Sequence, residues 1–241
     1  MKKIAIFAEG QTELIFIRWL LLRLIDNSKL SFECRELLAH NESPAPYKYS
    51  ALDPQVYFRI IDVHGDEGVL SSIHERESSL LRAGYDEIIA VRDMYSETYL
   101  NLSPKRMSDT VTRKIIDAHH ETIRQMTHRD RIKLYFAIME IEAWFLGMYN
   151  IFKKIDPLLT TSFIGQKLKI DLANVDPQES FFKPSDQVEA IYALCGRAYG
   201  KRKQEIEGIC SKMDIADFND ARENGRCSTF EEFYRAIAKY C

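Results

Sequence analysis

The stretch KIAIFAEGQTE, residues 3–13, decides the fold class. Residues 3–8 form a nearly continuous apolar run, which is typical of a strand buried on both faces of a sheet. Glu9 and Gly10 interrupt this run, and leucine and isoleucine then recur at helical spacing as far as Ile25. The stretch therefore predicts a buried strand, a tight turn at glycine and a helix, the opening unit of an α/β protein.

The same alternation of strand and helix continues along the chain. Further strands are predicted at 57–63, 86–91 and 132–138, and helices at 69–82 and 108–126. Strands that alternate with helices indicate a mostly parallel, Rossmann-like sheet flanked by helices and joined by right-handed crossovers.

Other segments have weaker patterns. Residues 30–54 are rich in serine, proline and tyrosine and predict a long loop with at most one edge strand, and 95–104 predicts a second loop. Later in the chain the strand signal fades, and 151–176 is irregular before a series of short helices. We expect an α/β domain over residues 1–150 and a small helical region over residues 151–241 that packs on it.

The composition excludes several classes of protein. The chain has 241 residues, 46% hydrophobic and 29% charged, with a formal net charge of -3, which is ordinary for a globular protein and compatible with a local basic face. Its five cysteines are widely spaced without a C-x-x-C, which argues against a disulfide framework or a zinc cage. Glu9 comes too early for the core of a secretion signal and no apolar run could span a bilayer, so we expect a cytoplasmic protein without membrane attachment.

Carboxylates follow three of the predicted strands. Glu9 ends the first, Asp93 the third and Glu140 the fourth, with Glu142 two residues further on. Ligands bind beyond the carboxyl ends of parallel strands, and carboxylates gathered there repel one another unless a cation neutralises them. Oxygen-only clusters suit Mg²⁺ or Mn²⁺, which can polarise a phosphodiester and activate water. The pattern predicts a metal site formed by these residues.

The same residues also have ordinary structural interpretations, which the sequence leaves open. A glutamate at a strand–helix junction interacts favourably with the helix dipole, as Glu9, Glu140 and Glu142 would. Asp93 would cap the turn that follows it. The coincidence of three strand-end carboxylates is what favours a site.

Three residues beside Glu9 are candidates for contacts with a substrate. Gly10 permits a tight turn and close backbone approach, and Thr12 either offers its hydroxyl to the substrate or caps the helix. Glu13 lies four residues after Glu9, so the two share one face of the helix. It is either an outer ligand of the site or a solvated charge paired with Arg18.

Two further residues are candidates for contacts with phosphate. His64 lies in the turn 64–68 at the end of a predicted strand, although a lone histidine in a turn is more often polar surface. Lys201 lies in a basic stretch that either contacts a phosphate backbone or is the solvated start of a helix. His119 and His120 are adjacent in mid-helix and face different ways, so paired metal ligation is not expected.

Three motifs resemble those of a known family. Residues 4–13 resemble the VEGxTE opening of the TOPRIM domains in the overcoming-lysogenisation-defect (OLD) nucleases, and 89–93 resembles their next acidic strand end. Residues 139–146 resemble the EIEAW segment of a largely uncharacterised bacterial family related to those nucleases. The C-terminal part fits that family at residues 199–201, 227–230 and Phe233. The resemblance covers residues 3–237.

The resemblance implies a TOPRIM fold that binds one or two Mg²⁺ ions. Glu9 would match the family's first-strand glutamate, a metal ligand or general acid/base. Asp93 would match the first aspartate of a D-x-D pair. Glu140, or less closely Glu142, would match the acidic residue of the later strand. The implied activity is Mg²⁺-dependent cleavage of nucleic-acid phosphodiesters. An ABC-type ATPase is the implied partner in anti-phage defence, and the chain's self-association into a homo-oligomer is left open.

One departure from the family pattern divides the functional interpretations. The second aspartate of the D-x-D pair would fall at position 95, which is Tyr95. Either Glu97 reaches in to replace it or that metal position is lost. We therefore expect a metal-dependent nuclease or, alternatively, a catalytically lapsed TOPRIM-like interaction or regulatory module. A plain α/β protein whose acidic residues only start helices is the third interpretation.

Overall fold

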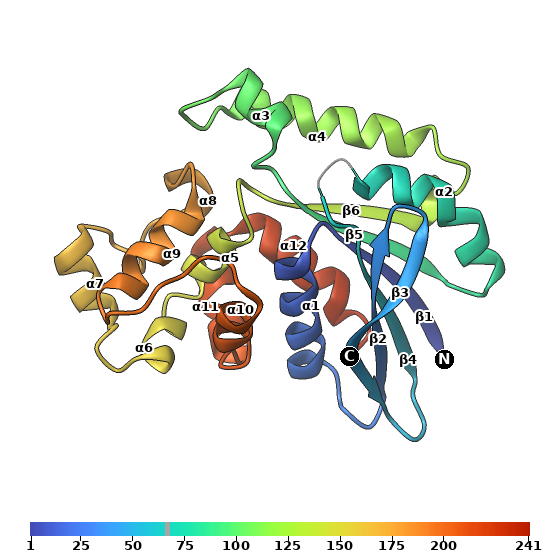
Figure 1. The fold of residues 1–241 in the computed structure, drawn as a ribbon, viewed down its shortest axis with the longest axis horizontal. Helices are drawn as coiled ribbons and strands as arrows, with labels where there is room; N and C mark the ends of the chain where they lie inside the picture. The colour runs from blue at the N-terminus through green and yellow to red at the C-terminus, as the bar shows by residue number, and fades with distance from the viewer. Residues whose placement is uncertain (66–67) are drawn as a thin grey trace. The chain divides into compact units, whose positions relative to one another are not determined.

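The computed structural model describes residues 1–65 and 68–241. Over these residues the chain forms a six-stranded sheet in the order β3-β2-β4-β1-β5-β6 (Figure 1). The strands are β1 (Lys2–Ala8), β2 (Leu30–Leu38), β3 (Asn41–Ser50), β4 (Val56–Asp62), β5 (Glu87–Asp93) and β6 (Ile132–Ala137).

The centre of the sheet is parallel. β1 pairs in parallel with both β4 and β5, and β2 pairs in parallel with β4. Ala8 at the end of β1 lies opposite Asp62 of β4 and Val91 of β5, so these strands end at one edge of the sheet. Residues 4–8 of β1 have no exposed surface, as expected for a strand covered on both faces. The expected α/β class with a mostly parallel sheet is confirmed.

The described residues fall into two compact units. The first, here called the sheet unit, comprises residues 1–92, 109–136 and 237–241. The second, the helical unit, comprises residues 93–108 and 137–236. The boundary expected at residue 150 falls inside the helical unit.

The sheet unit contains the helix after β1, the helix after β4 and the long helix that precedes β6. They are α1 (Gln11–Leu24), α2 (Gly68–Arg82) and α4 (Asp109–Arg124), with a 3-10 turn at Arg129–Arg131. Both α1 and α2 pack against β1, and α2 and α4 lie side by side (Figure 1). No helix in the described ranges is long and apolar enough to cross a bilayer.

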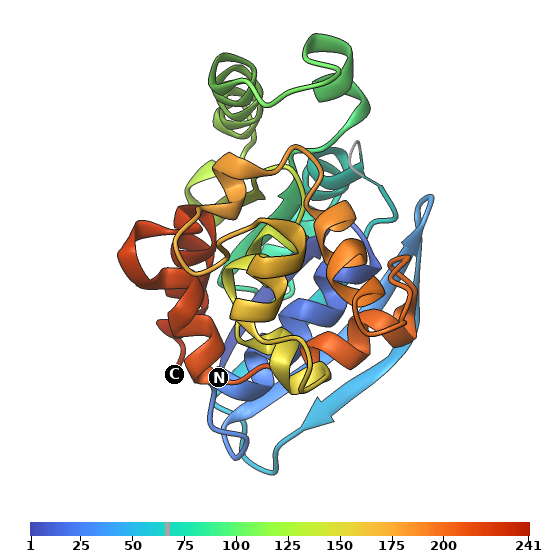
Figure 2. The ribbon, with the colours of Figure 1, turned by 90° about the vertical axis from the view of Figure 1, so that its left-hand side faces the viewer.

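Short helices make up the helical unit (Figure 2). They are α3 (Glu97–Leu102), α5 (Glu142–Gly147), α6 (Ile151–Ile155), α7 (Thr161–Leu168), α8 (Pro177–Ser180), α9 (Pro184–Ala193), α10 (Lys203–Cys210), α11 (Ile215–Arg222), a 3-10 turn at Glu223–Gly225 and α12 (Ser228–Ala238). Trp144 of α5 is fully buried, with its ring 5.4 Å from that of Phe230 and 5.7 Å from that of Phe233, both on α12. The expected C-terminal helices are confirmed.

The prediction of a long loop over residues 30–54 is wrong. The segment forms β2 and β3, an antiparallel hairpin in which Phe32 lies opposite Tyr49. Pro44 and Pro46 obscure the strand pattern. They are tolerated because β3 is the last strand in the sheet order, and an edge strand need not donate every backbone hydrogen bond.

Short helices also form in the expected loop at 95–104 and in the segment 151–176 that was described as irregular. α3 lies within 95–104, and the hydroxyl of Ser96 caps it by accepting the backbone N–H of Tyr99 at 3.2 Å. α6 and α7 lie within 151–176. Helices of this length span too few turns to establish an apolar period. In the turn expected at 64–68, residues 66 and 67 lie outside the described residues.

Candidate functional site

Glu9 lies at the edge of the sheet where β1 and β5 end. Its backbone N–H donates to the carbonyl of Val91 at 3.2 Å, and its own carbonyl accepts the N–H of Gly65 at 2.9 Å. The Glu9 Oε2 atom lies 3.8 Å from Nε of Arg92, with side-chain exposures of 16% and 7%. The predicted strand-end carboxylate therefore has a nearly buried guanidinium beside it.

His119 contacts Arg92 through a different nitrogen of the guanidinium from the one nearest Glu9. Nη1 of Arg92 contacts Nε2 of His119, and Nδ1 of His119 lies 2.8 Å from the carbonyl oxygen of Ile115. A carbonyl only accepts, so Nδ1 carries the proton and Nε2 accepts from Arg92. The sequence analysis missed this Arg92–His119 contact. The one available signal was that Arg92 directly precedes a strand-end aspartate.

The substrate-contact candidates after Glu9 lie at the start of α1. Thr12 and Glu13 are buried, at 9% and 4% exposed. A Cβ on Gly10 would lie 3.3 Å from a carboxylate oxygen of Glu13, so Glu13 folds back over the turn that Gly10 makes. Burial shows that Glu13 is not a solvated charge. Contact of these residues with a substrate stays a prediction.

His64 follows β4 in the left-handed region, with φ of 55°. Its backbone N–H donates to Oδ1 of Asp62 at 2.8 Å, and its ring Nδ1 lies 3.6 Å from the same oxygen. Burial raises the pKa of Asp62, an effect that the hydrogen bond from His64 opposes. His64 is partly exposed beside this carboxylate, and its contact with phosphate stays a prediction.

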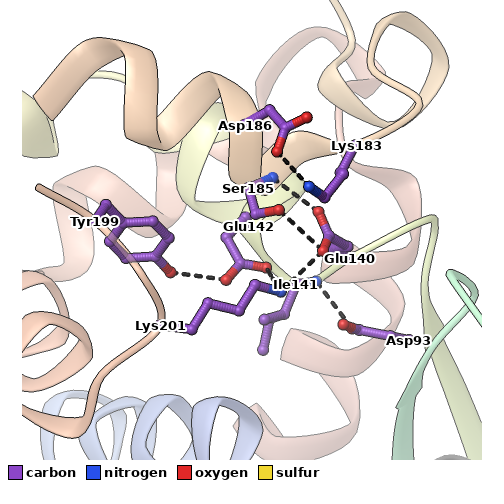
Figure 3. Close-up of polar contacts among 9 residues, drawn as sticks. All are labelled: Asp93, Glu140, Ile141, Glu142, Lys183, Ser185, Asp186, Tyr199 and Lys201. Carbon is purple, nitrogen blue, oxygen red and sulfur yellow. Dashed lines mark hydrogen bonds and ion pairs between the residues drawn. The ribbon is translucent and has the colours of Figure 1, made fainter. Parts of the chain in front are cut away.

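Four predicted site residues meet in the helical unit (Figure 3). We call Asp93, Glu140, Glu142 and Lys201 the acidic cluster. Asp93 is the last residue of β5, Glu140 lies between β6 and α5, Glu142 begins α5, and Lys201 lies between α9 and α10. Residues that the sequence separates widely are therefore brought together, including three of the predicted metal ligands.

Asp93 joins the end of β5 to the start of α5. Its Oδ1 accepts the backbone N–H of Ile141 at 2.9 Å, and the carboxylate is buried. Two backbone hydrogen bonds run alongside, from Met94 to Ala137 at 2.9 Å and from Tyr95 to Met139 at 2.6 Å. The two strand ends converge as predicted, with Asp93 acting as a cap.

Every carboxylate oxygen of Glu140 and Glu142 has a protein donor. Oε1 of Glu140 accepts from Nζ of Lys201 at 2.9 Å and from the hydroxyl of Ser185 at 3.0 Å, and Oε2 accepts the backbone N–H of Ser185 at 2.8 Å. Oε1 of Glu142 accepts from the hydroxyl of Tyr199 at 2.7 Å, and Oε2 accepts from Nζ of Lys201 at 3.0 Å. Lys201 bridges the two glutamates (Figure 3).

Burial and charge determine the protonation of this group. The side chain of Glu142 has no exposed surface, while that of Lys201 is 36% exposed. Burial raises the pKa of Glu142, and the Lys201 ammonium opposes this. Burial lowers the pKa of Lys201, but the charges of Glu142, Asp93 and Glu140 outweigh it and leave this pKa raised. Lys201 is therefore an ammonium, the counter-ion of the pair.

Tyr95 and Glu97 lie where the family pattern expects a second aspartate. The ring of Tyr95 packs edge-on against Phe182 with centroids 5.6 Å apart. Glu97 is exposed in the first turn of α3, where a carboxylate interacts favourably with the helix dipole. A metal role for Glu97 stays a prediction.

The Glu140–Glu142 pair, with the hydrogen bonds that it makes in this structure, does not fit a divalent ion. The oxygen-only chemistry of Glu140 and Glu142 suits Mg²⁺ or Mn²⁺, but their four oxygens already accept hydrogen bonds, and the bridging position is taken by the Lys201 ammonium. Within residues 1–65 and 68–241, no group of three or more histidine, cysteine, aspartate or glutamate residues could hold a metal.

The sequence analysis assigned Lys201 to phosphate and missed Ser185 and Tyr199. Ser185 reaches Glu140 from the first turn of α9, and Tyr199 reaches Glu142 from the segment before α10. The available signal was spacing: Tyr199 and Lys201 are two residues apart, as are Glu140 and Glu142.

Comparison of the chain with protein-family models, with curated proteins and with solved structures finds no match. The resemblance to TOPRIM proteins therefore stays a prediction from the three sequence motifs. The features of the structure that bear on function are the acidic cluster and the contact of Glu9 with Arg92.

Proposed function

We propose that this chain is a TOPRIM-like interaction or regulatory module that does not cut nucleic acid by a metal-dependent mechanism. The observation that carries the proposal is that all four carboxylate oxygens of Glu140 and Glu142 are bound by protein donors. A metal nuclease needs carboxylate oxygens for its ion and its water. Tyr95, at the position of the second aspartate, supports the same proposal.

The proposed partner follows from the resemblance alone. Related proteins occur beside an ABC-type ATPase in anti-phage defence, so we propose such an ATPase as the protein that this module regulates or is regulated by. Nucleic acid is proposed as what the assembly acts on, in the cytoplasm. Copurification of the chain with an ATPase encoded beside it tests this pairing.

Calorimetry tests the absence of metal chemistry without knowledge of a substrate. Mn²⁺ is titrated at millimolar concentration into the wild type and into Asp93→Ala. The proposal predicts no binding isotherm for either protein. A clear isotherm for the wild type that disappears in Asp93→Ala would contradict it.

A second candidate is the Mg²⁺-dependent nuclease with Glu9, Asp93 and Glu140 as its acidic residues. It is supported by the convergence of two strand ends, since Asp93 accepts from Ile141, the neighbour of Glu140. In that function Lys201 would contact substrate phosphate and Glu9 would act as ligand or general acid/base. The Glu140–Glu142 pair would then have to release Lys201.

Cleavage assays with DNA and RNA in Mg²⁺ test this candidate. It predicts that Glu9→Ala abolishes cutting without unfolding the protein. Glu179→Ala is the matched control, because Glu179 is an exposed carboxylate at the start of α8 and is not a candidate site residue. Cutting retained in Glu9→Ala, or absent from the wild type, counts against the nuclease.

A further inference from the structure

The acidic cluster carries its own cation. We infer that Lys201 permanently supplies the positive charge that the Glu140–Glu142 pair would otherwise need from a divalent ion. The inference rests on the proposed function, and it names the residue that makes the site independent of metal.

The geometry of the ammonium is that of a bridging ion. Nζ of Lys201 lies 2.9 Å from Glu140 and 3.0 Å from Glu142, so one charge serves two carboxylates. Like charges this close repel strongly where water is excluded, and Glu142 is fully buried. A cation between them is therefore required for both to be ionised, and Lys201 is the one in contact with both.

The backbone around Lys201 is set to aim its side chain inward. Lys201 has φ of 58°, a conformation that glycine adopts without strain and that lysine rarely adopts. One carboxylate oxygen of Glu205 accepts the backbone N–H of Gly200 at 2.7 Å and that of Arg202 at 3.0 Å. The first turn of α10 thus fixes the residues on both sides of Lys201. Because the contacts of the Lys201 ammonium with Glu140 and Glu142 offset this backbone strain, a lysine is retained at a position that glycine would occupy more easily.

Neighbouring groups complete the charge balance. Tyr199 donates to Glu142 and Ser185 donates to Glu140, both without adding charge. Lys183 is the other nearby lysine, but its Nζ pairs with Asp186 at 2.6 Å and both side chains are about half exposed. Lys183 is therefore a matched control, a lysine close to Glu140 that does not bridge the pair.

A double-mutant cycle on melting temperature tests the inference. The proteins are the wild type, Lys201→Met, Glu142→Gln, the double variant and Lys183→Met, each with and without Mn²⁺. Removing one partner of a buried ion pair strands the other charge, so Lys201→Met should lower the melting temperature by roughly 6–20 °C. The melting temperature of the double variant should fall by clearly less than the sum of the two single losses. Lys183→Met should change the melting temperature little, and Mn²⁺ should not change that of the wild type.

Two results would overturn the inference. One is a double variant whose loss equals the sum of the single losses, which would show no coupling between Lys201 and Glu142. The other is a rise in wild-type melting temperature with Mn²⁺ that is lost in Glu140→Gln, which would make the metal the cation. If Lys201→Met does not fold, the Mn²⁺ measurement on the wild type and Glu140→Gln still decides.

The same proteins, together with Glu9→Ala in a cleavage assay, separate this inference from the proposed function. Mg²⁺-dependent cutting that depends on Glu9, together with coupling between Lys201 and Glu142, would refute the proposed loss of catalysis while leaving Lys201 as the cluster's cation. If the protein does not cut and Lys201 is not coupled to Glu142, the proposed loss of catalysis would stand and Lys201 would not be the cation of the cluster.

Discussion

Glu142 is an acid with no exposed surface, and its protonation links the acidic cluster to stability. Burial raises its pKa in the folded state above the ordinary value of 4.5. The folded protein therefore binds more protons than the unfolded chain as the pH rises past that value, and stability falls through that range. Glutamine at this position would remove the titration and keep one acceptor oxygen.

We predict that Glu142→Gln flattens the pH dependence of stability. The free energy of unfolding in urea is measured at mildly acidic and at neutral pH. The wild type should lose stability between the two, and Glu142→Gln should lose less. An equal loss in both proteins would show that Glu142 does not titrate in this range.

His119 is predicted to stabilise Arg92. His119→Ala removes the acceptor for a nearly buried guanidinium beside Glu9, which should cost about 1–3 kcal/mol in the free energy of unfolding. His120→Ala is the control, because the side chain next in sequence is exposed. Equal effects of the two substitutions in urea unfolding would mean that the Arg92 contact contributes nothing.

At the scale of elements, Asp93 ties β5 to the start of α5. Asp93→Ala should cost about 1–3 kcal/mol, because it leaves the buried N–H of Ile141 without its acceptor. Asp93→Asn retains an acceptor oxygen and should recover most of this stability. Urea unfolding of the pair measures the capping role, and a loss as large in Asp93→Asn as in Asp93→Ala would show that charge, not capping, is what matters.

Elements with a clear apolar pattern were predictable, and β3 was not. β1 and β5 are mostly apolar and buried, whereas β4 and β6 alternate buried residues with more exposed ones. β3 carries prolines on an edge, where tertiary position decides whether they are tolerated.

The acidic cluster was partly predictable for a related reason. Strand-end position indicates where Asp93 and Glu140 lie. Lys201 contacts Glu142 across 59 residues, through a loop whose path no local pattern encodes. The sequence therefore predicted a divalent metal ion at these carboxylates and did not indicate that Lys201 contacts them.

At the scale of the molecule, the chain returns to the sheet unit at its last residues. The hydroxyl of Tyr240 donates to Glu87 of β5, and its ring packs edge-on against Phe58 of β4 with centroids 5.6 Å apart. Lys239 also pairs with Glu87, at 2.6 Å. Residues 237–241 thus join two strands that are not neighbours in the sheet, because β1 lies between β4 and β5.

We predict that Tyr240→Ala destabilises the protein by about 2–3 kcal/mol, from the lost hydrogen bond and the lost aromatic pair. Lys239→Ala removes a partly exposed ion pair and should cost less than about 1 kcal/mol. Thermal unfolding of both variants measures the difference. Similar losses of stability in Tyr240→Ala and Lys239→Ala would indicate that pairing with Glu87, and not packing of the Tyr240 ring on Phe58, is what stabilises the C-terminal residues.

The most direct test of the lysine-held cluster is a crystal structure determined in the presence of Mn²⁺, with anomalous scattering from the metal recorded. The account predicts that the ammonium of Lys201 lies between Glu140 and Glu142 and that no anomalous peak lies within coordination distance of either carboxylate. A peak bound to Glu140 or Glu142, with Lys201 displaced from the pair, would contradict it.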